Sequence, residues 1–298
     1  MSLINQESWP GPMWATMRLL AFKSHPVSFD EARALLSPPT LGVGVEDMFE
    51  TAVMTLESLG LVTRLETGKL ARSGPVADLD GQDYDAFIAV LRQVVIDPRR
   101  NTDLGISNSQ AGPRDLCRAL CWFLSEDPLG RPLNWEAAEQ AQINALNEDA
   151  GPAIINNTRW PRFVEWATAL GFGTTALPIH GTAAQIVPDC TRAVRQTVRD
   201  LWKPNETVPA VEFLSRLREA LPVIPGGALS MDVGIRSPGE GVAGFAVSFA
   251  ILRGMDEGWL TLRRDADARF SLSLHDHDAP ASPHLYSTVT IHKDHDDD

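Results

Sequence analysis

The feature that most constrains this fold is an order of elements that occurs three times along the chain: helix, extended segment, two helices, two strands. Its clearest copy lies between Arg114 and Asp189. A helix with an apolar face over residues 115–124 comes first, and in the extended segment that follows Asn134 is well placed to cap a second helix, which ends near Leu146. This copy therefore opens with two helices joined by an extended segment.

The same copy closes with a third helix and a pair of strands. The helix begins near Arg159 and stops at Gly171. Two strand-like segments, residues 174–177 and 184–187, then flank a turn at residues 180 and 181. A helix, an extended segment, two helices and a hairpin wing together predict a winged helix.

The N-terminal copy matches the central one position by position. Its first helix is expected over residues 14–23, and Ser28 with Glu31 forms a capping box at the start of the second helix. The remaining elements are a third helix over residues 46–58 and wing strands over residues 62–65 and 69–72.

The C-terminal copy has diverged further. Its helices are expected over residues 191–202, 210–221 and 242–257, with an extended segment at 207–209. Strands over 260–263 and 269–274, turning through residues 265–267, are expected to form a hairpin. A glycine stands between the third helix and the strands in every copy, at Gly60, Gly171 and Gly258. Three ordered copies make chance the weaker explanation.

Composition limits what these modules bind. The chain has 298 residues with 44% apolar content, enough for more than one core, and it holds no apolar run that would span a bilayer. The first twelve residues lack the regions of a signal peptide, and three cysteines without metal spacing suggest buried thiols, so we expect a cytoplasmic protein. The formal net charge of −13 opposes approach to a polyanion.

One stretch nevertheless carries a nucleic-acid signal, because a helix-turn-helix protein reads bases from the start of its third helix. The candidate DNA contacts are Asn156, Asn157, Thr158, Arg159 and Arg162 at that helix start, with Arg99 and Arg100 from an earlier loop. In the alternative interpretation Asn157 or Thr158 only caps the helix while Trp160, Phe163 and Trp166 pack inward. The loop over residues 99–110 is either a binding loop or a disordered connector.

No recognisable catalytic set is present: the chain has no nucleophile elbow, no phosphate loop and no zinc-protease motif. Residues 275–298 hold five of the seven histidines, mixed with aspartates. Such a tract can bind a transition metal, but this spacing matches no closed site, and solvated disorder is the better interpretation.

The segments NTRWPRFVEWA at residues 157–167 and IVPDCTRA at residues 186–193 resemble DpdG-type proteins, which are encoded in bacterial anti-phage gene clusters. The similarity takes in the N-terminal start and most of residues 1–274. The resemblance implies a non-enzymatic accessory subunit that works with helicase or nuclease partners in defence. It carries over no catalytic residues.

These observations predict a mainly α protein with small β-hairpins (α+β) built from tandem winged-helix modules. The expected modules are residues 1–76, 113–188 and 189–274, with a linking helix and loop at 77–112 and a disordered tail at 275–298. The expected function is a non-enzymatic accessory subunit of an anti-phage defence system that acts through protein–protein contacts, with DNA as a further candidate partner. The alternative is a sequence-specific DNA-binding transcription regulator. We expect no cofactor, metal or membrane, and a helicase, a nuclease or a second copy of the chain as protein partner.

Overall fold

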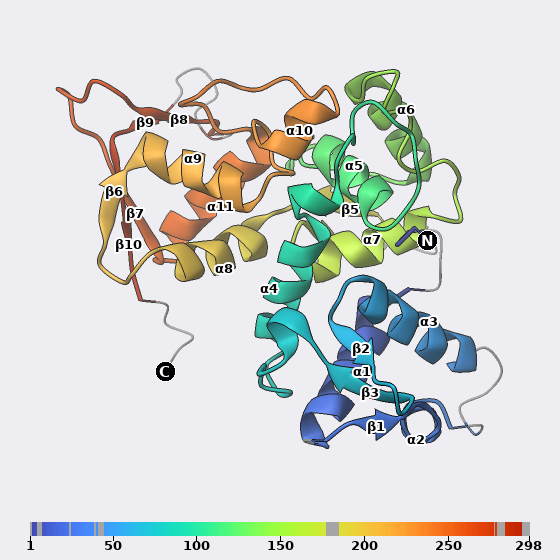
Figure 1. The fold of residues 1–298 in the computed structure, drawn as a ribbon. Coiled ribbons are helices and arrows are strands. Elements are labelled where there is room, and N and C mark those ends of the chain that lie inside the picture. Colours follow the sequence, from blue (N-terminus) through green and yellow to red (C-terminus); the bar gives the residue numbers. More distant parts are fainter. Residues whose placement is uncertain are drawn as a thin grey trace.

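The computed structural model describes residues 2–4, 8–23, 25–38, 40, 45–176, 185–276, 278 and 284–293, and Figure 1 shows how their helices and strands are arranged. Within these residues the chain is mixed α/β, with eleven α-helices and small antiparallel sheets. The expected combination of helices with small hairpins is therefore present. None of these helices is long and apolar enough to cross a membrane.

The N-terminal module comprises α1 (Pro10–Phe22), β1 (Val27–Ser28), α2 (Phe29–Leu36), α3 (Val45–Ser58), β2 (Val62–Arg64) and β3 (Lys69–Arg72). Its sheet has the order β1-β3-β2 and is antiparallel throughout, with Val27 opposite Leu70. Ser28 Oγ accepts the backbone N–H of Glu31 at 3.1 Å, which confirms the predicted cap of α2. The module's core forms where α1 packs across α3.

The central module comprises α5 (Arg114–Phe123), α6 (Trp135–Ala145), α7 (Trp160–Ala169), β4 (Gly173–Thr175) and β5 (Ile186–Pro188). Asn134 Oδ1 accepts the N–H of Ala137 at 3.0 Å, so Asn134 caps α6 as predicted. Gly171 ends α7 with φ of +78°, in the left-handed region that glycine favours. The expected turn at residues 180 and 181 lies outside the described residues.

The C-terminal module contains α8 (Thr191–Leu201), β6 (Thr207–Pro209), α9 (Ala210–Ala220), α10 (Ala228–Asp232), α11 (Phe245–Asp256), β7 (Leu260–Arg263), β8 (Leu272–Leu274), β9 (His284–Tyr286) and β10 (Thr288–Ile291). One sheet has the order β6-β10-β7, and β8 pairs with β9 in a separate hairpin. The third helix begins at Phe245 rather than 242, because Ala243 donates its N–H to Ser273 O at 3.0 Å in an extended conformation.

Two predictions for the C-terminal region were wrong. β7 does not form a hairpin with residues 269–274 but pairs with β10, where Leu262 lies opposite Val289. β10 also pairs with β6, so residues 284–293 belong to the fold and are not a disordered tail. The physical reason is the alternation in β10, which buries Val289 and Ile291, with 0% and 3% of their surface exposed, in spite of the acidic residues around it. Residues 294–298 lie outside the described part of the chain.

All three modules share one strand connection. The strand that follows the first helix pairs with the last strand of the module, which in turn pairs with the strand after the third helix. In the central module the first of these strands is reduced to a single bridge between Leu133 and Ile186, and β4 pairs with β5. The sequence repeat therefore corresponds to a repeated topology.

A linking helix, α4 (Tyr84–Val95), lies between the N-terminal module and the other two (Figure 1). Arg92 on α4 is 2% exposed, and it donates to Leu170 O at 2.7 Å and to Gln196 Oε1 at 2.8 Å. Burial lowers the pKa of Arg92 to about 10, so its guanidinium stays charged at neutral pH. This arginine joins α4 to the end of α7 and to α8.

The connector after α4 is ordered. It begins with the short helix η3 (Pro98–Arg100), and the following residues are held by α5, where the Arg118 guanidinium donates to Ser107 O at 2.5 Å and to Ser109 O at 3.0 Å. Gly105 packs directly on α10, because a Cβ at this position would come within 1.7 Å of Asp232 O. Of the two alternatives for the loop, a disordered connector is wrong.

Candidate functional site

The start of α7 was the main candidate for nucleic-acid contact, and Arg159 at this start is buried. Its residue exposure is 4%, and its Nη1 lies 3.5 Å from Asp115 Oδ2. Asp115, on α5, is fully buried and also accepts a hydrogen bond from the hydroxyl of Ser2. Asp115 therefore joins the first residues of the chain to α5, and Arg159 pairs with this carboxylate. The burial of Arg159 argues against the predicted DNA contact.

Burial and charge act in opposite directions on Asp115. Burial raises the pKa of its carboxyl, while the Ser2 hydroxyl and the Arg159 charge lower it, and the direction that results is upward. Two of the guanidinium nitrogens of Arg159, Nε and Nη1, have no hydrogen-bond acceptor in the structure. The ion pair at 3.5 Å therefore offsets only part of the cost of removing both charges from water.

Of the other candidates at this helix start, Asn156, Asn157 and Thr158 are exposed and Arg162 is half-buried, and most of them bind neighbouring residues. Asn156 Oδ1 accepts from the hydroxyl of Thr158 at 2.7 Å and from the N–H of Arg159 at 3.2 Å. These bonds close the turn before α7, whose N-cap position, Arg159, has no side-chain cap, so neither Asn157 nor Thr158 caps the helix. Arg162 donates to Thr158 O at 2.5 Å, and its guanidinium lies 5.8 Å from the centre of the Trp9 ring. Asn157 is exposed.

The aromatic side chains of α7 face inward, as expected. Trp160, Phe163 and Trp166 are each at most 2% exposed. Trp166 Nε1 donates to Ser8 O at 2.8 Å, so α7 is also fixed to the N-terminal segment. The face of α7 that carries these rings belongs to the core.

Arg99 and Arg100 already have partners within the chain. The Arg99 guanidinium donates from Nε to both oxygens of the Asp97 carboxylate and from Nη2 to Oδ2, and these bonds hold the pKa of Asp97 below its usual range. Arg100 donates to Leu59 O at 2.9 Å and to Ser58 O at 3.4 Å, where it satisfies carbonyl groups at the end of α3. Both residues stabilise local structure, and a role in phosphate binding would require Arg99 to leave Asp97.

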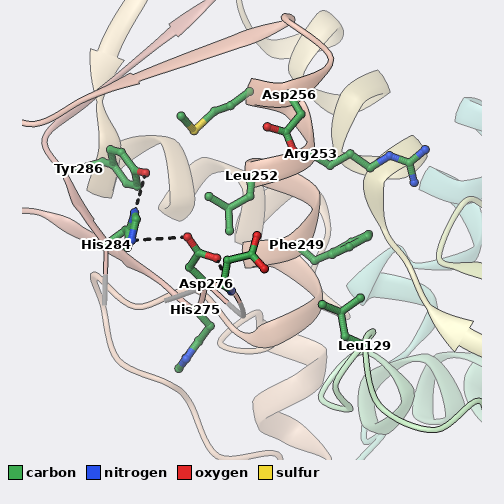
Figure 2. A pocket seen from close by; sticks show the side chains of 11 residues that line it. Leu129, Phe249, Leu252, Arg253, Asp256, His275, Asp276, His284 and Tyr286 are labelled. Carbon is green, nitrogen blue, oxygen red and sulfur yellow. Dashed lines mark hydrogen bonds and ion pairs between the residues drawn. The ribbon is translucent and has the colours of Figure 1, made fainter. Parts of the chain in front are cut away.

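A second candidate site was missed by the sequence analysis. A cavity of about 520 Å³ opens between α11 and the β8–β9 hairpin (Figure 2). Phe249, Leu252 and Met255 from α11, with Leu129 from the segment between α5 and α6, form its apolar floor. The opposite wall comes from residues that were assigned to the tail. The only sequence signal was the apolar spacing of α11, which resembles that of any core helix.

The polar wall of this cavity is acidic. Asp256, Asp276 and Asp278 line it beside His284 and Tyr286. His284 lies between Asp276 and Tyr286, because its Nε2 lies 3.5 Å from Asp276 Oδ2 and its Nδ1 lies 3.3 Å from the Tyr286 hydroxyl (Figure 2). Burial raises the pKa of Tyr286 and the nearby Asp276 charge adds to this effect, so the phenol remains protonated at neutral pH.

Two further observations limit the chemistry of the described residues. Among them, no group of three histidine, cysteine or acidic side chains is arranged to hold a metal ion. The three cysteines, Cys117, Cys121 and Cys190, are free thiols and fully buried, and burial raises their pKa values, as expected for packing rather than reaction. The cavity is therefore suited to binding through an apolar floor and an acidic rim.

Comparison with protein families matches residues 1–268 to the DpdG-like family. No curated protein and no solved structure matches the chain. The matched range includes the start of α7 and the whole of α11, and it ends before β8 and β9. One wall of the cavity thus lies outside the part of the chain that the family comparison covers.

Proposed function

Because the chain belongs to the DpdG-like family, whose members are associated with DNA modification and defence, we propose that it is a non-enzymatic accessory subunit of a bacterial anti-phage system. It works by binding other proteins of that system, a helicase or a nuclease among them. Its three modules are winged helices. The pairing of the extended segment after the first helix with the last strand, which recurs in all three modules, supports this assignment, although α10 and the β8–β9 hairpin are additional in the C-terminal module and the central module has only a bridge at Leu133.

The charge of the three third helices carries the proposal. Together α3, α7 and α11 contain two arginines and six acidic residues. A winged helix that reads duplex DNA places this helix in the major groove, and affinity for the duplex comes largely from Lys and Arg at phosphates. Third helices of this charge instead favour protein partners, which winged helices bind through helix grooves and sheet edges.

A second candidate function is sequence-specific DNA binding by the central module. The exposed side chains of Asn157 and Thr158 and the half-buried Arg162 at the start of α7 favour it, because asparagine and arginine make bidentate contacts to base edges. DNA binding by the central module would depend on Arg162 as the cation at this helix start, since Arg159 is buried against Asp115. A transcription regulator would therefore use far fewer phosphate contacts than is usual.

Fluorescence anisotropy with labelled duplex and single-stranded DNA over a salt series separates the two functions. Wild-type protein is compared with Arg162→Ala, and with Arg236→Ala as a control at an exposed site on another module. Under the accessory-subunit proposal neither DNA binds at low salt. Binding that weakens with salt, and that Arg162→Ala but not Arg236→Ala reduces, would establish the regulator instead.

A further inference from the structure

We propose that the outer face of α11 and the cavity beside it form a docking groove for a basic amphipathic helix of a partner protein. The groove is defined by Phe245, Phe249, Leu252, Leu129 and the carboxylates of Asp256, Asp276 and Asp278. The inference rests on the proposed function, since it names the surface through which one partner is bound.

The outer face of α11 is apolar beyond what the core requires. Ala246, Val247, Ala250 and Ile251 on its inner face are almost fully buried and form the core contact. On the outer face Phe245, Phe249 and Leu252 follow one another at positions i, i+4 and i+7, and Phe245 is 40% exposed. Apolar side chains that gather on one surface mark an interaction site, whereas isolated ones do not.

The cavity extends this apolar face. Leu129, 56% exposed, lines the cavity, and Figure 2 shows Leu252 and Phe249 projecting from α11. A volume of about 520 Å³ is enough for one or two large side chains. A helix that lies in a groove inserts apolar side chains at positions i, i+3 or i+4, and i+7, which is the spacing that the outer face of α11 itself presents.

The charged side chains around the groove determine which sign of charge a partner must carry. Asp256, Asp276 and Asp278 contribute three carboxylates, and within the described part of the chain neither Asp256 nor Asp278 has an ion-pair partner. The one arginine of the lining, Arg253, points away from the cavity (Figure 2) and is bound to Glu257 at 2.7 Å and to Asp189 at 3.3 Å. The rim is therefore complementary to lysine or arginine side chains and repels phosphate.

α11 also occupies the position of the helix that reads DNA in a winged helix. Here an apolar and acidic surface replaces the basic one that such a helix needs. The occupant that fits this surface is a helix with leucine-like side chains on one face and lysine or arginine on the flanks.

Two labelled peptides test the groove with the full-length chain. Both are helical, about 18 residues long so that the helix is stable enough, with leucines on one face. One carries lysine and the other glutamate on the remaining positions. In anisotropy measurements we expect the lysine peptide to bind about tenfold more tightly than the glutamate peptide. Its affinity should fall as salt is added.

Variants show whether the peptide occupies the groove. Phe249→Ser is expected to lower the affinity for the lysine peptide by about tenfold. The double variant Asp256→Asn/Asp278→Asn is expected to lower this affinity by about threefold and to make it less dependent on salt. Phe270→Ser is the control, because Phe270 is 68% exposed and does not line the cavity. Equal affinity for both peptides, or equal effects of Phe249→Ser and Phe270→Ser, would overturn the groove, as would binding that both acid replacements leave unchanged.

Co-purification of the full-length chain with the co-expressed proteins of its gene cluster separates the groove from the proposed function. Loss of a partner from the Phe249→Ser and Asp256→Asn/Asp278→Asn chains but not from Phe270→Ser supports the groove. A complex that all these variants retain overturns the groove and leaves the proposed function intact. The absence of any complex with wild-type protein overturns both.

Discussion

Replacement of Arg159 by alanine tests whether this residue is a structural anchor or a nucleic-acid contact. The substitution removes the only cation paired with Asp115 among the described residues and leaves that carboxylate in a site with 0% exposure. Removing one partner of a buried ion pair costs about 3–5 kcal/mol, and the Ser2 hydroxyl, the Leu116 N–H and the Arg118 charge that remain place the expected cost at the lower end. We therefore expect the melting temperature to fall by on the order of 10 °C.

Arg162→Ala is the matched control, one helical turn away on the surface of α7. Its guanidinium contacts Trp9 and the backbone of Thr158, so its loss should cost at most about 1 kcal/mol. A chain in which Arg159→Ala also carries Asp115→Asn should recover part of the loss, about 1–3 kcal/mol, because the buried charge is then gone.

The pH dependence of the Arg159→Ala effect follows from the direction of the Asp115 pKa. A carboxyl whose pKa is raised on folding contributes stability that is present below the unfolded pKa and is lost as pH rises through the folded value. Without the Arg159 charge this pKa rises further. The stability difference between wild type and Arg159→Ala should therefore be largest near pH 8 and shrink as pH falls toward the folded pKa.

Differential scanning fluorimetry and urea unfolding at a series of pH values measure these differences. Equal stability of Arg159→Ala and Arg162→Ala at pH 8 would refute the assignment of Arg159 as a buried anchor. An unchanged melting temperature together with weaker DNA binding would restore the original interpretation of Arg159 as a contact residue.

Three further predictions concern packing. Ending the chain after Leu274 removes β9 and β10, so circular dichroism and limited proteolysis should show loss of the C-terminal module, whereas ending it after Lys293 should leave the module folded. Gly105→Ala places a Cβ 1.7 Å from Asp232 O and should lower stability by about 1–3 kcal/mol, while Gly11→Ala, which has open space in α1, should raise it by up to about 1 kcal/mol, both measured by thermal unfolding. The three thiols should not react with Ellman's reagent at pH 8 in the native protein and should all react in guanidinium, since each is fully buried with a raised pKa; reaction without denaturant would show that the thiols are accessible.

Local signals in the sequence predicted the parts of the fold that are decided locally. The caps at Ser28 and Asn134 depend on side chains within three residues of the N–H groups they bind, so the residue types alone locate the helix starts. The left-handed glycine at Gly171 and the inward aromatics of α7 likewise follow from a few neighbouring positions. The internal repeat in the sequence predicted the order in which the helices and strands follow one another.

These local signals did not predict pairing between residues that are distant in sequence. β10 joins β6 across about eighty positions of sequence, and the Asp- and His-rich residues around it concealed an alternating strand. Arginine at the start of a third helix is typical of a DNA contact. The position of the Arg159 side chain is instead set by Asp115, which is distant in sequence and buried on another helix. The cavity beside α11 is formed in part by the β8–β9 hairpin. It could not be predicted, because that hairpin had been assigned to a disordered tail.

We propose that this chain of the DpdG-like family acts as a protein-binding subunit. The most direct measurement is size-exclusion chromatography with light scattering on the tagged full-length chain co-expressed with the other proteins of its gene cluster, with and without nuclease treatment. We expect a complex of defined mass that nuclease leaves intact. A chain that elutes without these proteins and binds duplex DNA with a steep salt dependence would contradict it.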